Sequence, residues 1–106
     1  MNVQYESREG QLRVWLRGEL GHHEAISLMA RLSALVEDHL PACTVLDLSG
    51  LEFMDSSGIG LVMGRYKLMK SVQGRIRVQN LSPGAYKVMK LAGLERLGEI
   101  RQKEVV

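Results

Sequence analysis

The chain has 106 residues, of which 45% are hydrophobic and 25% are charged, as is typical of one soluble globular domain. Its 14 basic and 12 acidic residues are spread along the sequence, a balance that gives no reason to expect a nucleic-acid partner, which normally requires a clustered basic face. The single cysteine, Cys43, excludes an internal disulfide or a multi-cysteine metal site. No apolar run approaches the roughly 20 residues of a membrane-spanning helix, and the N-terminus does not resemble a signal peptide. We therefore expect a cytoplasmic protein without a membrane or nucleic-acid partner.

The first half of the chain predicts two strands and a helix. Residues 11–17 alternate apolar and polar side chains, which is the period of a half-buried strand. Residues 3–7 are predicted as its neighbour across the turn Arg8-Glu9-Gly10, and residues 18–21 as a loop. From about residue 22 to residue 39, apolar side chains recur at spacings of three and four, which predicts an amphipathic helix that ends before a proline.

The second half of the chain alternates between strand and helix patterns. The predicted elements are a strand at residues 44–48, a loop at 49–56, a helix at about 57–72, a strand at 75–79, a helix that begins at Ser82-Pro83, and a last strand at 97–105. The strand at 44–48 is nearly continuously apolar, as in strands buried on both faces. Leu51, Phe53 and Met54 are expected to be buried anchors of the loop. The alternation indicates an α/β fold with a partly parallel sheet and helices packed on it.

The stretch from Asp47 to Gly60 carries the functional signal, because a loop there leads into a helix that begins at the pair Ser56-Ser57. The first turn of a helix leaves backbone N–H groups unpaired at the positive end of the helix dipole. A phosphate attached there would meet hydrogen-bond donors, and it would set about −1.5 to −2 charges beside Asp55. Gly58, like Gly60, keeps side chains away from the helix start, which would let a partner's active site approach. From local chemistry alone, a simple helix cap is the more frequent role of such a serine.

The surrounding motifs point to a family. The segment Phe53-Met54-Asp55-Ser56-Ser57-Gly58-Ile59-Gly60, followed by Gly64-Arg65-Tyr66-Lys67, resembles the signature of anti-sigma factor antagonists, the STAS family. Gly18-Glu19-Leu20 with His22-His23, Leu81-Ser82-Pro83 and Leu91-Ala92-Gly93-Leu94 also match the family in order and spacing. More narrowly, the chain is similar to the stage II sporulation antagonists of spore-forming bacteria.

The resemblance covers roughly residues 3–100 and implies a fold, a site and partners. The implied fold is a single α/β STAS domain over residues 1–106, with a mixed sheet of four or five strands and three or four helices packed on it. By the resemblance, an anti-sigma factor that is itself a serine kinase phosphorylates Ser57. The unphosphorylated protein binds this kinase and releases its sigma factor, and a serine phosphatase reverses the modification. The residues that the resemblance assigns to partner binding are Gly21, His22, His23, Asp55, Ser56, Ser57, Gly58, Ile59 and Leu61.

Such a switch is not an enzyme, needs no cofactor and is expected to be a monomer. Two departures from the family pattern bear on it. Gly21 stands where the sporulation antagonists commonly carry aspartate, so partner affinity or specificity is expected to differ. Relatives often continue into a final helix, which is expected to be absent or vestigial here without disabling the switch.

Other functions fit the sequence less well. The main alternative is a receiver-like phosphoacceptor that uses Asp47 or Asp55, but the first strand offers no acidic pair for magnesium. The glycines after Ser57 do not have the spacing of a dinucleotide-binding loop, and neither serine lies in a hydrolase nucleophile motif. The adjacent His22 and His23 point in different directions at a helix start, so we expect no metal site there.

Overall fold

The computed structural model describes residues 2–103 of the chain. In chain order its elements are β1 (Asn2–Arg8), β2 (Gln11–Leu20), α1 (His22–His39), β3 (Cys43–Met54), α2 (Ser57–Ser71), β4 (Arg75–Leu81), α3 (Pro83–Leu91), a 3₁₀ turn η1 (Leu94–Arg96) and β5 (Glu99–Gln102). The α/β class and the predicted helices are thereby confirmed. The end of the predicted last strand, residues 104 and 105, lies outside the described residues.

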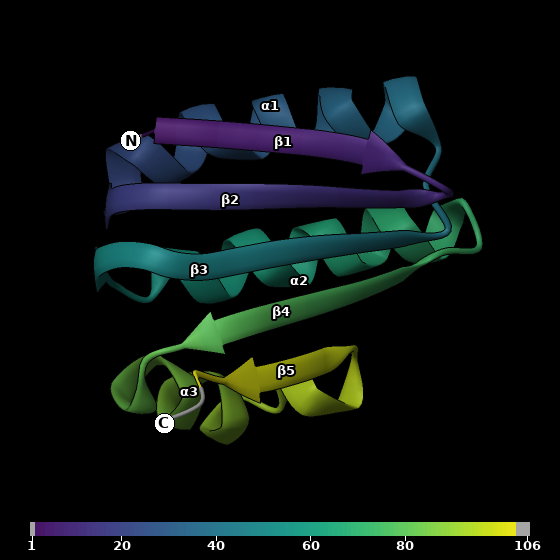
Figure 1. Cartoon of the computed structure of the whole chain (residues 1–106). Helices are drawn as coiled ribbons and strands as arrows, with labels where there is room; N and C mark the ends of the chain where they lie inside the picture. Colours follow the sequence, from purple (N-terminus) through teal and green to yellow (C-terminus); the bar gives the residue numbers. More distant parts are fainter. Residues whose placement is uncertain (1, 104–106) are drawn as a thin grey trace.

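The strands form one sheet in the order in which they occur in the sequence, β1-β2-β3-β4-β5. β1 and β2 form an antiparallel hairpin whose turn residues Glu9 and Gly10 both have positive φ, and the other neighbours are parallel. Connections between parallel strands are almost always right-handed, so a sheet whose order never reverses has its crossover helices on one face. Figure 1 shows this arrangement, with α1 and α2 behind the sheet and, within residues 2–103, no helix in front of it.

The core lies between the helices and the covered face of the sheet. It is mostly aliphatic, as the composition predicted, and α3 contributes Met89, which is fully buried. Two polar contacts hold α2 in place: the Thr44 hydroxyl donates to Met69 Sδ at 3.1 Å, and Arg65 Nη1 donates to the Met29 carbonyl of α1 at 3.1 Å. These contacts fix α2, and therefore its N-terminal turn, against the sheet and α1.

The strands β2 and β3 extend beyond their predicted ends. Residues 18–20 and 49–54, expected as loops, pair as parallel strands up to Leu20 and Met54, with register shifts along the way. Gly18 has a φ of +113°, which other residues rarely adopt, at one of these irregularities. The prediction that Phe53 is buried is wrong, because its side chain is 52% exposed on the extended end of β3.

Candidate functional site

The candidate site lies where the parallel strands β2 and β3 end and the chain enters α1 and α2. The Asp55 N–H donates to the Leu20 carbonyl at 3.2 Å, which ties the two strand-to-helix connections together. Ligand sites of α/β sheets commonly lie beyond the carboxyl ends of parallel strands, where such connections gather. The start of α1 and the start of α2 therefore form one surface.

Asp55 organises the first turn of α2. Its Oδ1 accepts the Ser57 N–H at 2.8 Å, and its backbone carbonyl accepts the Gly58 N–H at 3.1 Å. The Ser56 carbonyl in turn accepts the Ile59 N–H at 3.1 Å. Ser56 has helical φ and ψ of −62° and −15°, and its side chain makes no capping bond. Asp55, and not a serine, is thus the side chain that caps this helix.

This geometry corrects one expectation. A phosphate on Ser57 was expected to meet unpaired N–H groups in the first turn, but the N–H groups of Ser57, Gly58 and Ile59 already have acceptors. The reason is that Asp55 and a tight i to i+3 turn occupy donors that helix starts usually leave free. A phosphate there would still interact with the helix dipole, but it would find these three N–H groups occupied and would lie near the Asp55 carboxylate.

The two serines remain available for modification. Ser56 is exposed and Ser57 is half-buried at the start of α2. Among the described residues, neither hydroxyl makes a hydrogen bond that would hold it in place. Ser57 therefore presents a hydroxyl on a backbone that its own N–H bond to Asp55 fixes.

The structure brings Gly21 next to this turn. A Cβ built at Gly21 would lie 3.9 Å from Asp55 Oδ2 and 3.1 Å from Glu24 Oε2. A side chain at this position would therefore lie beside the carboxylate that caps α2. His22 and His23 follow at the exposed start of α1, with their ring centroids 5.9 Å apart.

Two residues that were assigned to partner binding are not on the surface. Leu61 is only 1% exposed and packs in the core, because the apolar side chains of α2 are not confined to one stripe and this one is turned toward the core. Gly58 is buried, and a Cβ there would lie 2.4 Å from Met54 Sδ, so its lack of a side chain makes room for Met54 and not for a partner. Ile59 is half-buried against the core.

Sequence reasoning missed a groove beside the site. It has a volume of about 320 Å³ and runs between the extended end of β3 and the start of α3. Exposed Phe53 and Val88 line it, together with Met54, which also packs under Gly58. The sequence carries little signal for this groove, because the groove forms only where β3 extends beyond its predicted end.

Asp47 does not have the environment of a phosphoacceptor. It is 5% exposed, and it accepts hydrogen bonds from the Ser49 N–H at 3.0 Å, Gln79 Nε2 at 3.1 Å and Asn80 Nδ2 at 2.8 Å. The sheet order also differs from the 2-1-3-4-5 order of receivers. Both features argue against the receiver-like alternative.

Within residues 2–103, no group of three or more histidine, cysteine, aspartate or glutamate side chains is arranged to hold a metal ion. No helix in this part of the chain has the length and apolar character needed to cross a membrane.

Comparison with known proteins identifies the family. Residues 3–101 match the family described as Mlab, STAS domain. An anti-sigma F factor antagonist of Paenibacillus polymyxa is 32% identical over 105 residues, which are 99% of this chain and 90% of that protein.

Two solved structures share both the fold and part of the sequence. The anti-sigma factor antagonist SpoIIAA in its unphosphorylated form has a TM-score of 0.80 and 32% identity, over 93% of this chain and 87% of that one. The Bacillus cell fate determinant SpoIIAA in its phosphorylated form has a TM-score of 0.74 and 32% identity, over 93% and 90% of the two chains. This chain therefore belongs to the STAS-domain family, among the anti-sigma factor antagonists, which are regulatory proteins and not enzymes.

Proposed function

We propose that this protein binds an anti-sigma factor serine kinase in its unphosphorylated form, releases the sigma factor that the kinase holds, and is switched off by phosphorylation of Ser57. A serine phosphatase would restore the binding form. By similarity to the anti-sigma F factor antagonist and to SpoIIAA, the proposed setting is the cytoplasm of a sporulating bacterium.

The observation that carries the proposal is the environment of Ser57. Its hydroxyl lies at the start of α2, half-buried and without a hydrogen bond to the described residues, on a turn held by Asp55. A kinase supplies ATP, metal and base, so the substrate protein only has to present a hydroxyl on a rigid backbone. That SpoIIAA has been solved in both phosphorylation states supports the same modification in this relative.

The switch follows from electrostatics at a buried contact. If the partner covers Ser57, phosphorylation places a dianion in the interface, where an unpaired charge is costly. The N–H groups of Ser57, Gly58 and Ile59 already have acceptors, and the Asp55 carboxylate would repel the phosphate, so these backbone donors do not offset the new charge. Reversing occupancy from 1:99 to 99:1 requires about 5.5 kcal/mol of differential affinity. An unneutralised phosphate in an interface can supply much of that amount.

The proposed contact surface joins the starts of α1 and α2. It comprises Gly21, His22, His23, Asp55, Ser56, Ser57 and the accessible part of Ile59. Because Gly21 adjoins Asp55, its lack of a side chain leaves this part of the surface less acidic than an aspartate there would make it. We expect the affinity for a given kinase to depend on this position.

The proposal is tested by mixing the protein with the cognate kinase and ATP and mapping the phosphate by mass spectrometry. Modification at Ser57 is expected, and Ser57→Ala should bind the kinase without being modified. Ser56→Ala is the matched control and should still be phosphorylated at Ser57. Modification at Ser56 or at an aspartate would contradict the proposal. Acid treatment distinguishes the two, because it removes phosphate from an aspartate but not from a serine.

A further inference from the structure

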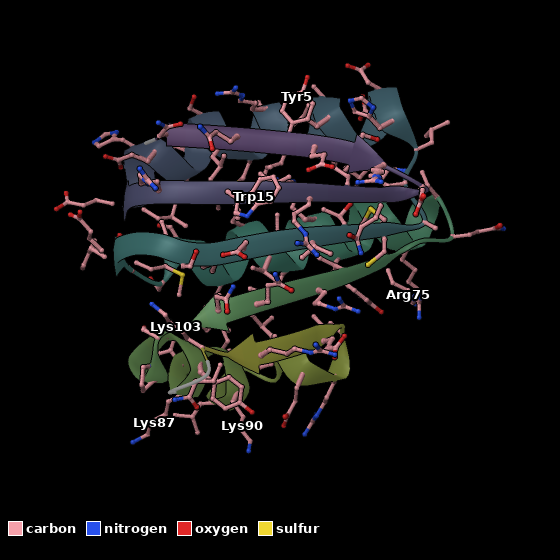
Figure 2. All side chains as sticks on the ribbon, viewed as in Figure 1. Tyr5, Trp15, Arg75, Lys87, Lys90 and Lys103 are labelled. Carbon is pink, nitrogen blue, oxygen red and sulfur yellow. The ribbon has the colours of Figure 1, made fainter. Side chains whose placement is uncertain are left out.

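No helix of residues 2–103 covers the face of the sheet opposite α1 and α2, and this face carries a distinct set of side chains. Strand register places the arginines Arg8, Arg13, Arg17, Arg75, Arg77 and Arg101 on this face, with the carboxylates Glu6, Glu19, Asp47 and Glu99. Trp15 lies among them on β2, in front of the sheet and away from α1 and α2 (Figure 2). We call this set the arginine face.

The charges on the arginine face are not balanced. The arginines outnumber the carboxylates, and Glu99 pairs with both Arg77 and Arg101, while the Asp47 carboxylate is bonded to neutral side chains. The lysines of the chain lie elsewhere, on α2, on α3 and just after β5. Arginine offers a planar group of donors that matches carboxylates in pairs, so a face with arginine as its cation suits carboxylate recognition.

Arg13 lies on β2, in register with Glu6 of β1 and Val45 of β3. Its guanidinium carbon is 5.9 Å from the centroid of the Trp15 ring, and its Nε is buried without a hydrogen-bond acceptor among the described residues. Between Arg13 and Arg77, in register with both, lies Val45, which is fully buried although it is not part of the core. The stems of the two arginines thus pack on the sheet and hold their charged groups at a defined place.

We propose that the arginine face is a second docking surface, which binds an acidic segment of a partner protein. The positive excess provides the complementarity, and the fixed arginines provide the donors. A nucleic acid fits less well, because Glu6, Asp47 and Glu99 interrupt the positive charge that a phosphate backbone would follow.

The chain contains a built-in probe for this proposal. Trp15 is its only tryptophan, so tryptophan fluorescence reports on the arginine face alone. Titration with a deca-glutamate peptide at low salt should change the emission of Trp15 saturably. The double variant Arg17→Glu with Arg75→Glu reverses two exposed charges of the face and should weaken this binding at least about tenfold.

The matched control reverses two exposed charges on α3, with Lys87→Glu and Lys90→Glu, which lie away from Trp15 (Figure 2). This control should bind the peptide within about twofold of the wild type, as should Ser57→Ala, because the proposal does not depend on the phosphorylation switch. Equal loss in the two charge-reversed variants would show unspecific attraction and overturn the proposal. So would the absence of a saturable change, or tighter binding of a decathymidylate than of the peptide.

Discussion

Asp55 contacts the first turn of α2 through both its side chain and its backbone carbonyl. Serine and aspartate are both good helix caps, so the sequence Asp55-Ser56-Ser57 does not reveal which residue has that role. Backbone geometry decides it, since Ser56 already has helical φ and ψ and cannot direct its hydroxyl back to the turn. Because Asp55 caps the helix, neither serine hydroxyl is needed for capping.

Replacing Asp55 should therefore destabilise the protein more than replacing Ser56. We expect Asp55→Ala to lower the free energy of unfolding by about 1 kcal/mol, because the Ser57 N–H loses its acceptor. Ser56→Ala, which removes no hydrogen bond of the described residues, should change it by less than about 0.5 kcal/mol. Urea denaturation of the two variants measures both values. A larger loss in Ser56→Ala than in Asp55→Ala would contradict the assignment of the cap.

At the scale of the elements, Asp47 joins β3 to the end of β4. Burial raises the pKa of this carboxyl, but hydrogen bonds from Ser49, Gln79 and Asn80 lower it by more, so the pKa lies below the ordinary value of 3.8. Asn80 adopts a positive φ of 59°, in the left-handed region, at this contact. The carboxylate thus fixes the part of β3 from which the strand continues toward the candidate site.

The sign of this pKa shift gives a pH dependence. A carboxylate with a lowered pKa in the folded state stabilises the protein fully above its unfolded pKa, and this contribution is lost as the pH falls through the folded value. Asp47→Asn should cost about 1–3 kcal/mol at pH 7, because buried donors lose a charged acceptor. The difference from the wild type should shrink as the pH falls below about 3.8.

Urea midpoints of the wild type and Asp47→Asn, measured from pH 7 to pH 3, test this expectation. Glu52→Gln removes an exposed carboxylate that accepts no side-chain bond among residues 2–103, and it is the matched control. A difference between wild type and Asp47→Asn that stays constant over this range would show that the charge of Asp47 does not stabilise the fold.

The helices were predictable from the sequence because their signals are local. The apolar spacing over residues 22–39 and the Ser82-Pro83 start are properties of a few neighbouring residues, and the structure confirms both. The extension of β3 was missed because it depends on pairing with β2, which is distant in the sequence. Leu61 was misplaced for a related reason: the apolar side chains of α2 are spread around the helix and do not form one stripe, so the sequence does not reveal which side faces the sheet.

For the whole molecule, the order of the strands separates two surfaces. A sheet without reversal gathers its helices on one face, so the helix starts at the candidate site and the arginine face belong to different sides of the molecule (Figure 1). A modification at Ser57 therefore changes the charge of one surface without requiring the core or the other surface to move. This organisation suits a regulatory protein that acts by being recognised by its partners and not by catalysis.

We propose that a phosphate on Ser57 alters the surface and leaves the fold unchanged. Calorimetric titration of the cognate kinase with the unmodified and the fully Ser57-phosphorylated protein tests it most directly, with circular dichroism of both forms as a check on folding. We expect phosphorylation to weaken binding by about 10³-fold to 10⁴-fold, within the roughly 5.5 kcal/mol of a complete switch, while the spectra of the two forms coincide. Equal affinities of the two forms, or a loss of affinity accompanied by unfolding, would contradict it.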